Sequence, residues 1–533
     1  MRNHMAAGWF YSPSQIVKYF ATRLWPSLRP PKGAKLINPY QALAQLNRHH
    51  WLMFGVGFLG WTWDAFDFFT VSLCLTEISK DFGVKNSAVS WGLTLTLMLR
   101  SVGALIFGAM ADRYGRKWPM IINLVLFIIL ELGSGFTNNL SQFLGVRALY
   151  GIAMGGMFGP AAATALEDLP YDARGILSGL FQQGYGVGYL LASAFYRALV
   201  PTTSHSWRSL FWFGAGPPVL IIAFRLCLGE TNYFQILKAE REMEHRIKME
   251  NRAHGEHTEE KRTELKAFLQ NAWVSIKDNW VLLIYMFVVM SGFNSVSHGS
   301  QDLYPTYMKD QLGFDASQVT IVSCVGQIGA VIGGMTVGWI SSMTGRRLAM
   351  AVSCIIGGAL VPAYIFTRDM SVTAACFFEQ VFVGGVWGPI PIHLMELAPP
   401  GLRTLVVGLT YQLGNLASSA SATIESVIGE RFPLPPAADG TSRYDYGRVI
   451  GIFLGAVWAF ILFFVILGPE MTQEEREERA QEAKEFEELR LSGASLAEMG
   501  AQRIRTKESK AEHLEQVDED PEGKEEKKVT EMV

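Results

Sequence analysis

Long apolar runs, separated by short polar segments, fill most of the chain. A helix that crosses a bilayer needs about 20 mostly apolar residues, and two groups of six runs reach that length. The first group lies near 52–76, 90–111, 118–136, 140–165, 175–198 and 208–228, and the second near 280–304, 318–340, 348–367, 371–395, 404–428 and 448–468. The pattern predicts an all-α membrane protein with twelve transmembrane helices in two six-helix bundles.

Charged residues gather outside these runs. Basic residues precede the first run (Lys32, Lys35 and Arg48), fill the loop "ADRYGRK" and recur in the central stretch and the tail. Because Lys and Arg favour the cytoplasmic side of a membrane, we expect both termini and the central stretch to be cytoplasmic. The predicted parts are an N-terminal segment 1–50, a bundle 51–228, a linker 229–278, a second bundle 279–469 and a charged tail 470–533. The linker and tail could bind regulatory proteins.

Composition excludes several other classes. The net charge of −3 gives no reason to expect nucleic-acid binding. The five cysteines form no CxxC pair, so the sequence predicts no zinc site, no other metal and no disulfide framework. No nucleotide loop, metal cluster or nucleophile motif is present, so we expect no enzyme activity and no cofactor. The first fifty residues lack an apolar core before a small-residue cleavage site, and no cleaved signal peptide is expected.

The two groups of runs repeat one another. "GGMFGPAAATALEDLPYDARGILSGLFQQ" begins at Gly155 and "GGVWGPIPIHLMELAPPGLRTLVVGLTYQ" at Gly384, an offset of 229. At an offset of 230, "GAMADRYGRK" from Gly108 matches "GWISSMTGRR" from Gly338. Two parallel six-helix halves joined by a linker are the repeat plan of a secondary transporter.

The segment "GAMADRYGRK" resembles the signature of the major facilitator superfamily between its second and third spans. We expect Gly108 to allow close helix approach and Asp112 to accept donors from a helix end or a basic partner. Arg113 and Arg116 should anchor this loop at the cytoplasmic face.

Two acid–base pairs follow the fourth and tenth runs. The repeat relates Glu167 to Glu396 and Arg174 to Arg403. We expect Glu167 to pair with Arg174 and Glu396 with Arg403, as ion pairs that hold the cytoplasmic side shut and break when it opens. Static salt bridges at an interface are the alternative.

Ionisable residues inside the runs are costly in a bilayer, so each is a candidate for function. They are Asp64, Asp67, Arg100, Glu131, Arg147, His298, Asp302, Glu379, His393 and Glu425. Arg100 and Asp64 lie deep in their runs, near the membrane midplane. Glu131 and Arg147 fall at comparable heights, where a structural ion pair is at least as plausible as transport chemistry. Glu379, His393 and Glu425 are interpreted as structural.

The seventh run contains the polar stretch "NSVSHGSQDLYPT" at residues 294–306. Asn294, His298 and Asp302 are spaced four apart and therefore lie on one face of a helix. Pro305 should kink or end this helix, and the polar groups must face protein or water rather than lipid. The repeat offset places Asp64 opposite Asn294, so we expect the first and seventh helices to line one cavity.

This stretch is similar to the pattern Asn-x-x-Ser/Thr-His-x-Ser/Thr-Gln-Asp-x-x-x-Thr of the fungal lactate and carboxylate permeases, the Jen family. The fixed positions are Asn294, Ser297, His298, Ser300, Gln301, Asp302 and Thr306. Arg100 in the second run, and Gln412 and Asn415 of "YQLGN" in the eleventh, also look like that family's substrate residues. The similarity covers roughly residues 50–470. A satisfied core histidine in an ordinary facilitator is the alternative.

The resemblance implies proton-coupled uptake of short carboxylates such as lactate or pyruvate across the plasma membrane. Arg100 would bind the carboxylate, and Gln412, Asn415 and Asn294 would bind a hydroxyl or keto oxygen. Proton coupling would fall to His298 and Asp302, with Asp64.

Other functions remain open at this point. The same fold could carry dicarboxylates or a sugar-type solute, because "LGETNYF" and "GPE" faintly resemble sugar-porter loops. The chain could also be a nutrient receptor that signals through its charged tails.

Overall fold

The computed structural model describes residues 38–84, 86–253, 264–429, 431–435 and 443–471, together with residue 17 and isolated positions between 481 and 505. The chain divides into two compact units. One comprises Met1–Gly229 and Glu264–Glu475, and the other Glu230–Thr263 and Arg476–Val533. Both halves of the repeat belong to the first unit.

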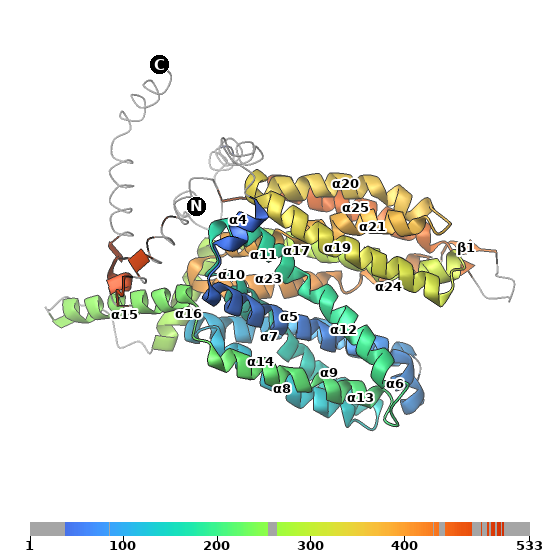
Figure 1. Ribbon diagram of the computed structural model, residues 1–533, viewed down its shortest axis with the longest axis horizontal. Helices are drawn as coiled ribbons and strands as arrows, with labels where there is room; N and C mark the ends of the chain where they lie inside the picture. The colour runs from blue at the N-terminus through green and yellow to red at the C-terminus, as the bar shows by residue number, and fades with distance from the viewer. Residues whose placement is uncertain are drawn as a thin grey trace, which may run out of the picture. The chain divides into compact units, whose positions relative to one another are not determined.

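The helices of the first half occupy all six predicted intervals (Figure 1). They are α4 (Pro39–Ala44), α5 (Arg48–Leu73), α6 (Leu75–Phe82), α7 (Asn86–Tyr114), α8 (Lys117–Gly135), α9 (Leu140–Gly155), α10 (Phe158–Leu166), α11 (Tyr171–Gln182), α12 (Gly184–Leu199), α13 (Trp207–Gly214) and α14 (Gly216–Cys227). The fourth, fifth and sixth intervals are each divided between two helices. Asn47 and His50 form a capping box at the start of α5, which fixes where this helix begins.

The second half follows the same plan. Its helices are α16 (Glu264–Asp278), α17 (Trp280–Gln301), α18 (Tyr304–Thr306), the π-helix η2 (Tyr307–Gln311), α19 (Ala316–Thr344), α20 (Arg346–Phe366), α21 (Val372–Trp387), α22 (Ile390–Leu397), the 3₁₀-helix η3 (Pro400–Leu402), α23 (Arg403–Ser418), α24 (Ser421–Gly429) and α25 (Tyr446–Leu467). The short strands β1 (Pro433–Leu434) and β2 (Arg443–Tyr444) pair antiparallel, with Pro433 opposite Tyr444.

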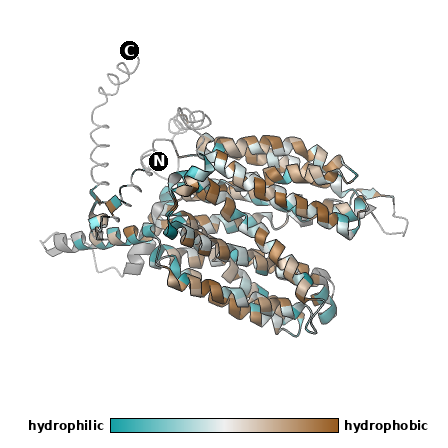
Figure 2. Cartoon of the chain, viewed as in Figure 1, coloured by the Kyte–Doolittle hydropathy of each residue, from teal (hydrophilic) through white to brown (hydrophobic). Residues whose placement is uncertain are grey.

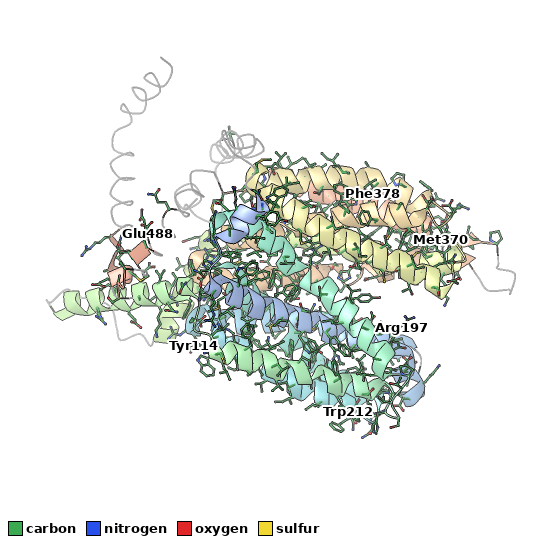
Figure 3. The ribbon with its side chains drawn as sticks, in the orientation of Figure 1. Tyr114, Arg197, Trp212, Met370, Phe378 and Glu488 are labelled. Carbon is green, nitrogen blue, oxygen red and sulfur yellow. The ribbon has the colours of Figure 1, made fainter. Side chains whose placement is uncertain are left out.

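The outside of the helices is apolar, as a lipid environment requires. Nine helical stretches in the described residues are long and apolar enough to cross a membrane, and hydrophobic residues run along helices such as α8 and α20 (Figure 2). The first, fifth and eleventh predicted intervals are helical but fall below those limits. Tyr114 and Phe378, labelled in Figure 3, are two of the exposed large side chains. The chain is therefore a multi-helix membrane protein.

The internal repeat recurs in the packing of α7 on α9 and of α19 on α21. A Cβ on Gly155 would collide with the backbone carbonyl of Arg100. At the repeat-related place, a Cβ on Gly384 would collide with the backbone carbonyl of Ala330. The two glycines let each pair of helices approach closely, and Gly155 thereby sets the position of the Arg100 backbone.

The second unit contains α15 (Asn232–Ala253) and part of the tail. Gly500 in the tail lies against the backbone of Ala239 and Glu240 in α15, so the described part of the tail packs on the linker helix. Most of the predicted tail, 470–533, lies outside the described residues.

Candidate functional site

The polar stretch of the seventh interval forms the last turns of α17. The helix ends at Gln301, ahead of Pro305, as the sequence predicts. His298 Nδ1 lies 2.9 Å from Asp302 Oδ2, and the two side chains are 17% and 44% exposed. The side chain of Asn415 on α23 also contacts the imidazole. The expected His298–Asp302 pair is therefore formed, and Asp302 is open to solvent.

Arg100 forms a second ion pair, with Asp64. Arg100 Nη2 lies 2.8 Å from Asp64 Oδ2, and the side chains are only 1% and 0% exposed. The ring of Phe68 lies 5.5 Å from the guanidinium carbon. Neither Arg100 Nε nor Asp64 Oδ1 has a hydrogen-bond partner among the described residues. The pair therefore satisfies its charges mutually while leaving one donor and one acceptor unused.

These two ion pairs belong to one site between the halves. The charge of Arg100 acts on His298 from across the site. Tyr185 on α12 is partly buried, and the charges of Arg100, Asp64 and Asp302 act on its hydroxyl. Residues of the first and seventh helices thus act on one another, and Tyr185 is a member of the site that the sequence did not indicate.

Aromatic rings form a floor beneath this site. The ring of Tyr411 on α23 lies 3.9 Å from that of Phe158, 5.7 Å from that of Trp61 and 5.6 Å from that of Trp387, measured between centroids. Gln182 Nε2 donates to the hydroxyl of Tyr411 at 3.3 Å. Tyr411 lies one residue before Gln412, and the charges of Arg100 and Asp64 act on its hydroxyl, so these rings border the polar site. The end of the unit that holds Asp112 is called here the Asp112 end.

The amide residues line the site from α17 and α23. Asn415 Nδ2 donates to Gln412 Oε1 at 3.1 Å, and the buried Gln412 Nε2 has no hydrogen-bond partner in the described part of the chain. Asn294 Nδ2 donates to the carbonyl of Met290 at 2.9 Å and lies beside Gly414. Gln412 thus retains a free donor, whereas the Asn294 side chain already bonds to its own helix.

The remaining residues of the motif tie α17 to α21. Trp387 Nε1 donates to Ser297 Oγ at 2.6 Å, and Gln301 Nε2 donates to Gln380 Oε1 at 3.0 Å. Ser300 Oγ donates to the carbonyl of Ser297 at 3.1 Å. Thr306 lies in the short helix α18. These contacts position the face that carries His298 and Asp302.

At the Asp112 end the two halves are in direct contact. Asp112 accepts backbone hydrogen bonds from Thr404 at 3.1 Å and Leu405 at 2.8 Å, in the first turn of α23. A carboxylate is favoured at a helix N-terminus. A Cβ on Gly108 would collide with Leu405, and Ser178 Oγ donates to the carbonyl of Gly388 at 2.9 Å. The expectation that Asp112 accepts donors from a helix end is confirmed.

The glutamates of this end bind arginines of the loop motif. Arg116 Nε and Nη2 donate to the carboxylate of Glu167 at 3.0 and 2.8 Å. Arg346, which the repeat relates to Arg116, contacts Glu396 at 3.4 and 3.1 Å. Each glutamate thus has the loop arginine of its own half as a bidentate partner. The sequence instead predicts a pair with the arginine seven residues after each glutamate.

The other basic residues of the predicted gate lie nearby. Arg174 Nε donates to the carbonyl of Leu169 at 2.8 Å, and Arg113 lies over the ring of Tyr114 at 5.5 Å. The charge of Arg403, from the second half, acts on Glu167 of the first. Arg346 Nη1 also donates to Ser342 Oγ at 3.3 Å, and Ser342 occupies the repeat position of Asp112.

A separate buried network lies within the first half. Arg147 Nη1 is 3.6 Å from Glu131 Oε1, so these two residues form a buried ion pair. The hydroxyl of Tyr150 donates to Asp67 Oδ2 at 2.6 Å. Asp67 is therefore engaged by Tyr150, although only two residues separate it from Asp64.

A sequence model of the family described as sugar (and other) transporters matches residues 52–482. The chain belongs to this family of the major facilitator superfamily. A carboxylic acid transporter protein homolog of Saccharomyces cerevisiae is 38% identical over 463 residues, which are 86% of this chain and 74% of that protein. A sialic acid transporter of Escherichia coli is 25% identical over 75% of this chain and 90% of its own length. The predicted resemblance to the fungal carboxylate permeases is confirmed, and the chain is a transporter rather than an enzyme.

Solved structures show the same fold. A major facilitator superfamily proton:xylose symporter bound to 6-bromo-6-deoxy-D-glucose superposes with a TM-score of 0.58, at 18% identity, over 81% of this chain and 99% of that one. The major facilitator fold predicted from the sequence is thereby confirmed.

Proposed function

We propose that this transporter is a proton symporter of short-chain monocarboxylates, such as lactate and pyruvate, that acts by alternating access in the plasma membrane. The observation that carries the proposal is the position of the Arg100–Asp64 pair opposite the His298–Asp302 pair in one site. A buried guanidinium suits an anion, and two titratable pairs beside it suit proton coupling. The similarity to a carboxylic acid transporter homolog supports the substrate class.

The Arg100–Asp64 pair links proton binding to anion binding. While Asp64 is ionised, it occupies the guanidinium at 2.8 Å. Protonation of Asp64 removes that competing charge, and the planar guanidinium can then bind the carboxylate of the substrate through two hydrogen bonds. The free Nε2 donor of Gln412 and the amide of Asn415 can bind the hydroxyl or keto oxygen.

The His298–Asp302 pair supplies a second place for protons. An imidazole titrates within the physiological pH range, and its Nδ1 lies 2.9 Å from Asp302, so a proton can pass between the two groups. A cycle that carries one proton with one monoanion moves no net charge. The membrane potential therefore does not oppose uptake.

Alternating access then requires the Asp112 end to open. We assign this end to the cytoplasm, together with both termini, because the basic loop residues Arg113, Arg116 and Lys117 lie there. Opening breaks the bonds from Asp112 to α23 and draws Arg403 away from Glu167. The halves rock around the site, as in other transporters with two repeats.

Acid-driven uptake tests this function. Labelled lactate uptake would be measured in cells that lack other permeases, at equal surface level, for the wild type and for His298→Ala, Asp302→Ala and Arg100→Ala. Arg100→Lys is the matched control for charge, since lysine keeps the positive charge but lacks the planar guanidinium that can donate two parallel hydrogen bonds. We expect all three alanine variants to lose most uptake and Arg100→Lys to recover only part of it. Wild-type uptake in all variants would exclude the proposed site.

A dicarboxylate is the second candidate substrate. Arg100 and a protonated His298 would place two cations in one site, as a dianion requires. Competition of labelled lactate uptake by succinate and malate separates the two substrates. Stronger inhibition by the dicarboxylates than by unlabelled lactate would favour the second.

A further inference from the structure

Glu425 lies on α24, the part of the eleventh helical interval that follows the helix bearing Gln412 and Asn415. Its side chain is fully buried. Neither of its carboxylate oxygens has a hydrogen-bond partner among the described residues. The sequence predicts a structural role for Glu425, yet its carboxyl group makes no hydrogen bond within the described residues that would support that role.

The carboxyl group of Glu425 lies against Gly299 in the polar motif of α17. A Cβ on Gly299 would stand 2.9 Å from Glu425 Oε1 and would also collide with the ring of Phe453. The carboxyl group therefore packs against the helix backbone between His298 and Ser300. This contact explains why the stretch "SHGSQD" has glycine at that position, which the substrate and proton roles of its neighbours do not.

Glu425 is also electrostatically joined to the proposed proton site. The charge of Asp302 acts on Glu425, and Asp302 bonds to His298. From α17, the titratable groups on this side are thus Asp302 and His298. From α25, the facing side chain is Phe453; Tyr446, two turns before Phe453, lies against Gly429, and Arg448 lies over the ring of Phe432.

An ionised carboxylate buried without donors is unfavourable, and a second carboxylate beside it makes it more so. With His298 and Asp302 charged, the three groups are neutral only when Glu425 carries a proton. We propose that Glu425 is a third protonatable group of the His298–Asp302 site and stores the coupled proton, which passes to Asp64 when the substrate binds and returns to Glu425 when the substrate leaves. This inference rests on the proposed proton symport.

The chemistry is a simple proton transfer. The carboxylate of Glu425 takes one proton, passed through the solvent-exposed Asp302, and becomes a carboxylic acid while the site faces outward. It releases the proton through Asp302 after the halves have rocked and the substrate has left. No other bond forms or breaks, and Gly299 leaves room for the carboxyl group beside the helix that precedes Asp302.

Purified protein in liposomes separates coupling from substrate movement. The first assay measures accumulation of labelled lactate under a pH gradient, and the second measures exchange of labelled for unlabelled lactate at equal pH, which requires no net proton movement. Under a gradient of one pH unit, a one-proton symporter concentrates its anion about tenfold. We expect Glu425→Gln to lose this accumulation while its exchange rate stays within about twofold of the wild type.

Glu379→Gln is the matched control. Glu379 is a buried acid of the same half, but its Oε1 accepts a hydrogen bond from Trp458 Nε1 at 3.1 Å, and we expect this variant to accumulate lactate normally. Accumulation by Glu425→Gln equal to the wild type overturns the inference. If the wild type itself accumulates no lactate under the gradient, the proposed function fails instead.

A spectroscopic measurement decides the matter if Glu425→Gln exchanges lactate poorly. Infrared difference spectra of the detergent-purified protein between acid and neutral pH report protonated carboxyl groups. A titrating carboxyl band in the wild type that is absent from Glu425→Gln supports the inference. Identical spectra for the two proteins overturn it.

Discussion

Asp112 and Leu405 join the two halves of this transporter: the carboxylate accepts the backbone N–H of Leu405 at 2.8 Å and that of Thr404 at 3.1 Å. The carboxylate belongs to the first half and the helix start belongs to the second. One side chain therefore stabilises the closed Asp112 end through two charge-assisted bonds.

Asp112→Ala should open this end. It leaves two backbone donors without their acceptor, at a cost of about 1–3 kcal/mol for a buried group. The accessibility of Ser178→Cys, whose position contacts Gly388 of the other half, reports opening through its labelling rate in a background with Cys227 and Cys324 replaced by serine. We expect faster labelling with Asp112→Ala than with Asp112. Asp112→Asn, which retains one acceptor, should lie between them; equal rates in all three would contradict the role of Asp112.

The Arg116–Glu167 pair should behave as a buried unit. Arg116→Ala leaves the carboxylate of Glu167 buried without its arginine partner, which lowers the free energy of unfolding by about 3–5 kcal/mol. The melting temperature of this variant in detergent should therefore fall steeply. The double variant Arg116→Ala with Glu167→Gln removes both charges and should recover part of the loss. The same comparison at Arg346 and Glu396 tests whether the repeat-related ion pair contributes as much to stability as the Arg116–Glu167 pair. If the fall in melting temperature of the double variant equals the sum of the falls of the two single variants, the two charges act independently.

Gly155→Ala should impair the substrate site without touching its side chains. The added methyl group collides with the backbone of Arg100, and overpacking of this kind costs about 1–3 kcal/mol. We expect lower lactate uptake at equal surface level because Arg100 shifts away from Asp64.

Two further glycines control this experiment. Gly145 lies on the same helix with nothing close to a Cβ, so Gly145→Ala should leave uptake unchanged. In Gly384→Ala the added methyl group collides with the backbone of Ala330, so this variant should destabilise the fold without changing the pH dependence of uptake. Normal uptake by Gly155→Ala would show that the Arg100 backbone has room to move.

Asp64→Asn should make substrate binding less dependent on pH. In the proposed cycle, acid protonates Asp64 and frees Arg100, so lactate binding by the wild type should strengthen as the pH falls. Asparagine resembles the protonated acid, and the variant should bind lactate at neutral pH as the wild type does in acid. Calorimetric titration of the purified protein at several pH values measures this.

Asp67→Asn is the comparison for that variant, because Asp67 bonds to Tyr150 rather than to Arg100. Its pH dependence should follow the wild type. An unchanged pH dependence in Asp64→Asn would exclude Asp64 as the competitor for Arg100.

Features that depend on one helix or on the repeat could be predicted from the sequence. The helix intervals follow from hydropathy, the His298–Asp302 pair from a spacing of four, and the helix end from Pro305. The repeat correctly related Glu167 to Glu396 and Arg116 to Arg346, because duplicated segments fold alike.

Features that depend on how loops and helices meet could not be predicted. Arg116 and Arg174 are both candidate partners of Glu167 in the sequence, and the sequence does not reveal which one extends toward the carboxylate. The floor of Trp61, Phe158 and Tyr411 comes from three helices of both halves, and single aromatic residues are common in apolar runs. Gln182 and Tyr411 do share the repeat offset of 229, which offered one indication.

The repeat is incomplete at the contact between the halves, and this has a consequence for the speed of the cycle. The first half places the carboxylate of Asp112 on the opposing helix, while the equivalent position of the second half holds the hydroxyl of Ser342. A transporter must leave its closed state on every turnover, so each contact that stabilises closure also slows reopening. The contact of the Asp112 carboxylate stabilises the closed side, and a symmetric carboxylate at position 342 would delay the release of every substrate molecule.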